Sequence, residues 1–215
     1  MGAEQAGLRT HFFKREIVMA ALPLIHPRIV RITHWINAAA IIVMILSGWA
    51  IYNADPIFPF RFPAGLTLGG GFIGALRLHF AAMWVLFANA IFMIGYGVLS
   101  GRYRRKLFPI RLRDIVADAR AALTGRLGHV DLSHYNAVQK VLYTAVLIGI
   151  VGVIVTGLAI WKPVQFQVVT QLLGDFDTVR TLHFLAMAGI ALFILIHVGM
   201  ALLVPRSLVA MLRGR

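Results

Sequence analysis

Residues 181–203, TLHFLAMAGIALFILIHVGMALL, form the stretch that decides the fold. This stretch is almost wholly apolar and is long enough to cross a bilayer as one helix. It contains two histidines, His183 and His197, which lie 14 residues apart. On a helix this separation corresponds to roughly 21 Å along the axis and places both side chains on nearly the same face. Ionisable side chains are costly inside a membrane and mark functional sites there, so the stretch predicts two sites at different depths.

The composition is that of an integral membrane protein. Of the 215 residues, 60% are hydrophobic and 13% are charged. Three more apolar stretches, at about 29–52, 74–99 and 137–161, are similar in length to the last one, which extends over about 181–204. Each of the four is sufficient for one transmembrane helix. The sequence therefore predicts an all-α fold, an integral membrane four-helix bundle.

The basic residues are distributed unevenly around these spans. Lysine and arginine cluster before the first span, in the loop 100–133 and after the last span, whereas the loops 53–75 and 162–180 contain few. By the positive-inside rule, the N and C termini should be cytoplasmic and the two weakly charged loops external. A formal net charge of +13 also suggests nucleic-acid binding, but basic residues that border apolar spans are better explained by membrane orientation.

The chain accordingly divides into a cytoplasmic N-terminal tail (1–27), a bundle domain (28–205) and a cytoplasmic C-terminal tail (206–215). Within the long basic loop, residues 110–123 are predicted to form an amphipathic helix on the membrane surface. The chain contains no cysteine, which excludes covalent c-type haem, cysteine-ligated iron–sulfur clusters and thiol catalysis. Any metal chemistry must then use histidine, carboxylate or methionine ligands.

Two further histidines match the depths of the pair in the last span. His34 lies near the cytoplasmic end of the first span, at the depth of His197. His79 lies about one turn inside the external end of the second span, at the depth of His183. Two imidazoles that face each other from different helices provide the axial ligands of a six-coordinate haem iron. We therefore predict two stacked haems between the helices, one bound by the inner pair, His34 and His197, and one by the outer pair, His79 and His183.

Arginines near the span ends are suited to the negatively charged haem propionates: Arg31, Arg77 and Arg180. One alternative is that the histidines are packed, hydrogen-bonded side chains without a ligand role. Another is a zinc or copper site, which is disfavoured because each depth offers two histidines and no nearby cysteine or carboxylate. Three histidines outside the spans are expected to be solvated: His11, His26 and His129.

Four motifs resemble those of a known family. They are RITHWINAAAIIVMILSGW (31–49), LRLHF (76–80), HYNAVQK (134–140) and TLHF…LIHV in the last span. They are similar to motifs of the cytochrome b561-like membrane subunits, which include the gamma subunits of formate dehydrogenases, the cytochrome b subunits of nickel–iron hydrogenases and thiosulfate-reductase-type cytochrome b. The resemblance covers roughly residues 28 to 215. GFIGALRLHF, SGRYRRKLFP and MLRGR look most similar to the thiosulfate-reductase-type branch, whose members accompany a periplasmic molybdopterin enzyme.

The resemblance implies a quinone-linked electron-transfer subunit that carries two haems b. In the family, the first and second helices each contribute one histidine ligand and the fourth helix contributes two. Those motifs fall on His34, His79, His183 and His197 of this chain, in agreement with the matching of depths.

The family also implies a quinone site at the cytoplasmic start of the third helix. The YNAGQK motif of formate dehydrogenase gamma subunits reads Tyr135-Asn136-Ala137-Val138-Gln139-Lys140 here, so Val138 replaces the glycine. A quinone head group has two carbonyls that need hydrogen-bond donors, and the candidates are His134, Tyr135, Asn136 and Gln139. The alternative is that this cluster only caps the helix, with Lys140 as its anchor.

The predicted function is electron transfer in the bacterial inner membrane between a periplasmic redox partner, a molybdopterin oxidoreductase, and the quinone pool. The chain would be the electron-transfer subunit and not the subunit that converts substrate. The first rival is a stand-alone b561-type superoxide:quinone oxidoreductase, which would need a cationic external surface. The apolar external segments 57–65 and 164–169 instead suggest a docking surface for a large partner. The second rival is a haem-free transporter or assembly factor, which leaves the depth-matched histidines without a role.

Overall fold

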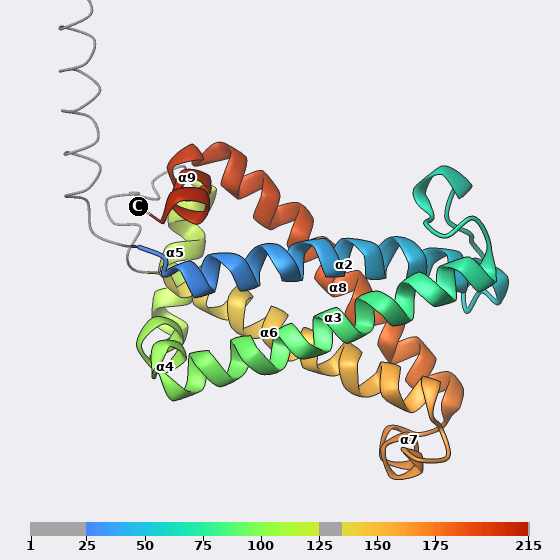
Figure 1. Ribbon diagram of the computed structural model, residues 1–215. Helices are drawn as coiled ribbons and strands as arrows, with labels where there is room; N and C mark the ends of the chain where they lie inside the picture. Colours follow the sequence, from blue (N-terminus) through green and yellow to red (C-terminus); the bar gives the residue numbers. More distant parts are fainter. Residues whose placement is uncertain (1–24, 125–134, 215) are drawn as a thin grey trace, which may run out of the picture.

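The computed structural model describes residues 25–124 and 135–214 and is organised around four long helices (Figure 1). These are α2 (Arg28–Ala54), α3 (Phe72–Leu99), α6 (Ala137–Trp161) and α8 (Phe176–Leu203). Each is long and apolar enough to cross a membrane. The predicted all-α membrane bundle is thereby confirmed. The predicted N-terminal tail falls largely outside the described residues.

Helix α8 begins at Phe176, ahead of the predicted start at 181. Asp175 is the reason, because its side chain accepts a hydrogen bond of 2.7 Å from the backbone N–H of Thr178 and caps the helix. Asp177 adds a negative charge to the first turn, where the helix dipole favours it. The extra turn places His183 about two turns inside the helix instead of one.

The four long helices form two pairs. Helix α2 packs along α3 and α6 packs along α8, whereas helices of different pairs approach each other closely at few places. Within the first pair, the Asn89 side-chain amide donates to Asn37 Oδ1 (2.6 Å) and to the Thr33 carbonyl (2.8 Å). Such hydrogen bonds between membrane helices contribute on the order of 1 kcal/mol each. Large side chains bridge the two pairs: His34 to His197, Tyr52 to Phe184, and Phe80 and Trp84 to Trp161.

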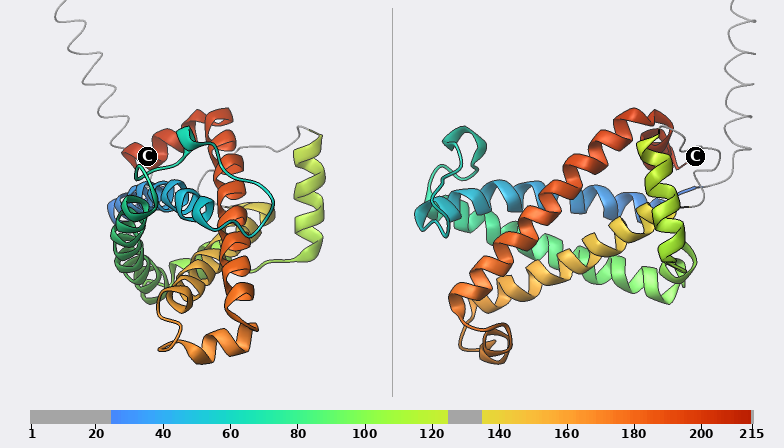
Figure 2. Two further views of the ribbon diagram at one scale, coloured as in Figure 1. Left: turned by 90° about the vertical axis from the view of Figure 1, so that its right-hand side faces the viewer. Right: turned by 180° about the vertical axis from the view of Figure 1, so that it is seen from behind.

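Three shorter helices gather at one end of the bundle, which we call the basic end (Figure 1). They are α4 (Arg102–Leu107), α5 (Leu112–Leu123) and α9 (Pro205–Arg213). Figure 2 shows that α5 runs across the bundle axis, as the predicted surface helix at 110–123 should. Most of the predicted C-terminal tail is helical, in α9. The N–H of Ile25 donates to the Gly214 carbonyl (2.9 Å), so the two ends of the described chain meet here.

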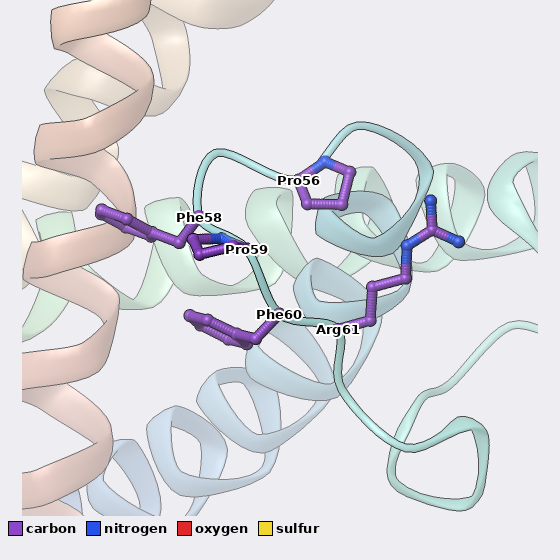
Figure 3. Close-up of a pocket in the computed structure, with 5 residues that line it drawn as sticks. All are labelled: Pro56, Phe58, Pro59, Phe60 and Arg61. Carbon is purple, nitrogen blue, oxygen red and sulfur yellow. The ribbon is translucent and has the colours of Figure 1, made fainter.

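The opposite end, which we call the loop end, contains the segment 55–71 and α7 (Gln167–Leu173). Three phenylalanines of the segment, Phe58, Phe60 and Phe62, surround Phe184 of α8, with ring centroids 5.4, 6.2 and 6.4 Å from it. In Figure 3, Phe58 and Phe60 point toward α8 and Arg61 points away. A cavity of about 380 Å³ in this segment is lined by Pro56, Phe58, Pro59, Phe60 and Arg61. The cavity lies within the segment 55–71, and none of the four span histidines lines it.

Candidate functional site

The four span histidines occur at two matched depths. His34 lies six residues after the first residue of α2, and His197 lies six residues before the last residue of α8. His79 and His183 each lie seven residues after the first residue of α3 and α8, respectively. The members of each pair come from different helix pairs. The histidines thus form an inner pair near the basic end and an outer pair near the loop end.

The rings of the inner pair face each other across the bundle. The ring centroids of His34 and His197 are 6.0 Å apart, with the ring planes at 62°. Placed in this way, the two imidazoles could hold one haem iron between them. Phe193 stacks on His197 at 5.4 Å, and the edge of Trp35 contacts His34 at 5.3 Å. The surroundings of the inner pair are therefore largely aromatic.

Each outer histidine is held by a hydroxyl of the neighbouring helix. His79 Nδ1 lies 3.0 Å from Ser47 Oγ of α2, and His183 Nδ1 lies 2.9 Å from Thr156 Oγ1 of α6. In each helix pair, a hydroxyl of one helix therefore contacts the outer histidine of the other helix.

Glycines follow both hydroxyl residues and give the rings space. A Cβ at Gly48 would lie 3.4 Å from His79 Cε1, and a Cβ at Gly157 would lie 3.2 Å from His183 Cε1. The second distance is tighter than most real contacts, so a side chain at 157 would displace the ring. A sequence signal for this arrangement exists, since ILSGWAI (45–51) and IVTGLAI (154–160) repeat the same pattern.

This geometry fits haem. At the inner depth, the imidazoles of His34 and His197 approach each other from opposite helix pairs. At the outer depth, His79 and His183 lie at matched positions on α3 and α8, so each depth offers the two imidazoles that a bis-histidine haem requires. Among residues 25–124 and 135–214, no group of three or more His, Asp or Glu side chains is placed to hold a metal ion. Within the same ranges, Arg31 Nε and Trp49 Nε1 are buried donors without a protein partner, and a propionate would satisfy such donors.

The three candidate propionate arginines differ in what they contact. Arg31 Nη2 donates to the Leu212 carbonyl of α9. Arg180 forms an ion pair with Asp55 (2.8 Å) and also donates to the Asp55 carbonyl (2.8 Å), which ties the start of α8 to the end of α2. Arg77 is exposed on α3. Of the three, Arg31 has the environment best suited to a propionate.

The motif at the start of α6 forms a capping box. Asn136 Oδ1 accepts from the Gln139 backbone N–H (2.7 Å), and Gln139 Oε1 accepts from the Asn136 backbone N–H (3.1 Å). The amide oxygens thus cap the helix, and Lys140 Nζ donates to the Pro109 carbonyl (3.3 Å). Any quinone contact from Asn136 or Gln139 would have to use the nitrogen of its side-chain amide. His134 lies outside the described residues.

Tyr135 connects this motif to the inner histidines. Its ring centroid is 4.9 Å from that of Tyr143, which in turn lies 6.3 Å from that of His197. Burial raises the pKa of Tyr135, although the nearby Arg102 acts in the opposite direction. The Tyr135 hydroxyl therefore keeps its proton at neutral pH and remains a hydrogen-bond donor.

Residues of the basic loop that precedes α6 also lie at this site. The sequence did not predict their contacts. Lys106 Nζ lies 5.9 Å from the centroid of the Tyr135 ring, and Arg102 Nη2 lies 3.5 Å from His26 Nδ1. The prediction that His26 is solvated is wrong. Burial, together with Arg102 and Lys106, lowers the pKa of His26 to about 4, so the ring is neutral at pH 7 and its Nδ1 accepts from Arg102. The sequence separation of 76 residues between His26 and Arg102 hid this contact.

Comparison with known proteins agrees with this geometry. A family model described as prokaryotic cytochrome b561 matches residues 25–214. A YedZ1 protein of Azospira oryzae, named as a protein-methionine-sulfoxide reductase subunit, is 46% identical over 190 residues, which cover 88% of this chain and 96% of that protein.

Two less similar relatives are also named as subunits of redox enzymes. A Ni/Fe-hydrogenase B-type cytochrome subunit of Cupriavidus necator is 26% identical over 80% of this chain and 76% of its own length. The formate dehydrogenase cytochrome b556(fdo) subunit of Escherichia coli is 29% identical over 86% of this chain and 81% of its own length. The predicted resemblance is confirmed, while the thiosulfate-reductase-type branch stays a prediction. The chain is a multi-pass membrane protein that belongs to the prokaryotic cytochrome b561 family, the b-type cytochrome subunits of oxidoreductase complexes.

Proposed function

We propose that the protein binds two haems b and transfers electrons between the membrane quinone pool and a periplasmic redox enzyme. The observation that carries this proposal is the pair of matched histidine depths, His34 with His197 and His79 with His183. Haem, when bound, supplies the one-electron redox chemistry. The chain supplies two imidazole ligands at each depth, an apolar environment and Arg31 as a propionate donor. Two such sites in line connect the two faces of the membrane.

The proposed orientation has the basic end in the cytoplasm. The basic residues of α4, α5 and α9 lie at this end and include Arg102, Arg104, Arg105, Lys106, Arg113, Arg120, Arg206 and Arg213. The positive-inside rule retains such residues on the cytoplasmic side. The outer histidine pair then lies near the periplasm and the inner pair near the cytoplasm.

Cysteine labelling tests this orientation directly, because the natural chain has no cysteine. We expect a membrane-impermeant maleimide to label Ala64→Cys, at the loop end, in right-side-out spheroplasts. The matched variant Asp114→Cys, an exposed position of α5, should be labelled only after the membrane is permeabilised. The reverse pattern would show that the basic end faces the periplasm, and the proposed functions of the two ends would then be exchanged.

The loop end is suited to a protein partner. Apolar side chains are exposed there on both external segments, including Phe60 (46% exposed) and Val164 (80% exposed). The superoxide oxidoreductase alternative would use a cationic surface, yet Arg180 at this end is paired with Asp55. Since the 46% identical relative is named as a subunit of a protein-methionine-sulfoxide reductase, we propose a periplasmic reductase as the partner. The resemblance to the thiosulfate-reductase-type branch further suggests that this reductase has a molybdopterin cofactor. Electrons would then flow from quinol through the inner and outer haems to that reductase.

The quinone site is proposed at the start of α6, beside the inner pair. Tyr135 supplies a protonated hydroxyl, and Asn136, Gln139 and His134 are further donor candidates from the same motif. Tyr143 fills the space between Tyr135 and His197, so a quinone held there would be close to the inner haem.

Reduction by a quinol tests the proposed function. In the purified, haem-loaded protein, a short-chain quinol should reduce both haems, and addition of an oxidised periplasmic reductase should reoxidise them. The matched control is the same protein with the quinol omitted. Haems that dithionite reduces but that no benzoquinol or naphthoquinol reduces would contradict a quinone-linked function while leaving haem binding intact.

A further inference from the structure

The two hydroxyls that contact the outer histidines have the same hydrogen-bond geometry. Ser47 Oγ donates to the Val43 carbonyl four residues earlier in α2, at 2.6 Å. Thr156 Oγ1 donates to the Gly152 carbonyl four residues earlier in α6, also at 2.6 Å. Each hydroxyl therefore uses its single hydrogen within its own helix.

This hydrogen count decides which ring nitrogen of each histidine carries the proton. A hydroxyl has one hydrogen to donate and can otherwise only accept. Since the hydrogens of Ser47 and Thr156 are already used, the short contacts at 3.0 and 2.9 Å require the Nδ1–H of His79 and of His183 to donate. The Nε2 atom of each ring is then unprotonated, with its lone pair directed away from the hydroxyl. An iron ligand needs this tautomer.

We propose that Ser47 and Thr156 are positioning residues that set the tautomer and lower the midpoint potential of the outer haem. This inference rests on the proposed function, because it takes His79 and His183 to be ligands of one iron. An imidazole whose other nitrogen donates a hydrogen bond is a more basic ligand. A more electron-donating ligand stabilises ferric over ferrous iron, so these hydrogen bonds lower the potential.

The inner pair is held differently. The ring contacts described for His34 and His197 are with aromatic side chains, Trp35, Phe193 and Tyr143, in addition to each other. Such contacts orient the rings by packing and accept no hydrogen bond from Nδ1–H in the way that a hydroxyl oxygen does. The hydroxyl effect should therefore be confined to the outer haem, and the inner haem provides an internal control within the same molecule.

The test is a spectroelectrochemical redox titration of Ser47→Ala, Thr156→Val and the double variant, each in the full-length, haem-loaded protein. None of these substitutions removes a proposed iron ligand, so haem should be retained in all three variants. We expect Ser47→Ala and Thr156→Val each to make the midpoint potential of one haem more positive, and this haem should be the same in both variants. The double variant should shift it further, and the other potential should not move.

Three control variants separate electronic tuning from a structural role. Ser47→Thr and Thr156→Ser keep the hydroxyl and should keep the wild-type potentials. Thr181→Val removes a hydroxyl that donates to the Asp177 carbonyl of α8, and this hydroxyl has no described contact with a histidine. It should leave both potentials unchanged. If an alanine or valine variant loses the outer haem, retention of haem and potential in the matched hydroxyl variant supports the positioning role.

Several outcomes would overturn the inference. Unchanged potentials in the double variant would show that the hydroxyls do not tune the haem. A shift of different haems by Ser47→Ala and Thr156→Val would show that His79 and His183 do not share an iron. Failure of the proposed function is distinguishable from these results, because it would appear as absent haem or as haem that quinol does not reduce in the wild-type protein.

Discussion

Replacement of His79 or His183 by alanine is expected to lower the haem content from two haems per polypeptide to one. Each substitution would remove one of the two axial ligands proposed for the outer haem, and an apolar bundle without that ligand should hold the macrocycle weakly. The inner pair is made by different residues, His34 and His197, and should retain its haem. Haem is quantified per polypeptide in the purified variants, and the remaining haem is characterised by its reduced spectrum.

The pairing gives this experiment its control. His34→Ala and His197→Ala should also leave one haem, but this haem should have the midpoint potential of the outer site. The double variant His79→Ala/His183→Ala should retain as much haem as either single variant, because both substitutions affect one site. Loss of both haems in that double variant, while His34→Ala/His197→Ala retains one, would contradict the proposed pairing.

Loss of the inner haem is expected to slow the reduction of the outer haem by quinol strongly. The two ligands proposed on α8, His183 and His197, are separated by roughly 21 Å along the helix. A quinone at the proposed site at the start of α6 would therefore be far from the outer site once the inner haem is removed. In His34→Ala and His197→Ala, reduction by quinol should slow by more than an order of magnitude, whereas dithionite should still reduce the remaining haem. Stopped-flow absorption spectroscopy measures both rates.

The complementary variant controls for general damage. His79→Ala retains the inner pair and should be reduced by quinol at close to the wild-type rate, although it should no longer deliver electrons to a periplasmic reductase. If quinol reduced His34→Ala and His197→Ala normally and failed to reduce His79→Ala, the quinone site would lie at the loop end, and Tyr135 would have no part in it.

The spans and the depth-matched histidines could be predicted from the sequence because both follow from long-range regularities. Apolar length identifies a membrane helix, and the direction of each span assigns a depth to every histidine in it. In the structure, the ring centroids of His34 and His197 lie 6.0 Å apart, in agreement with the depth assigned to these two residues. Nothing beyond hydrophobic length and position along each span was needed.

The remaining features depend on local hydrogen bonds or on contacts between distant segments. The start of α8 was placed too late because apolar patterning does not register a cap, and Asp175 extends the helix into polar sequence. The environment of His26 depends on a contact with Arg102 across the basic end, which no local pattern encodes. Ser47 and Thr156 were missed because a hydroxyl within an apolar helix commonly bonds only its own backbone. The repeated serine or threonine followed by glycine was the available signal.

The central claim is most directly tested by the absorption spectrum of the purified protein, oxidised and dithionite-reduced, with haem quantified per polypeptide. Two b haems with low-spin bis-histidine bands are the result that the matched pairs predict. One haem per polypeptide would mean that one of the two pairs, His34 with His197 or His79 with His183, is misassigned. No haem, in protein produced with an adequate haem supply, would contradict the account.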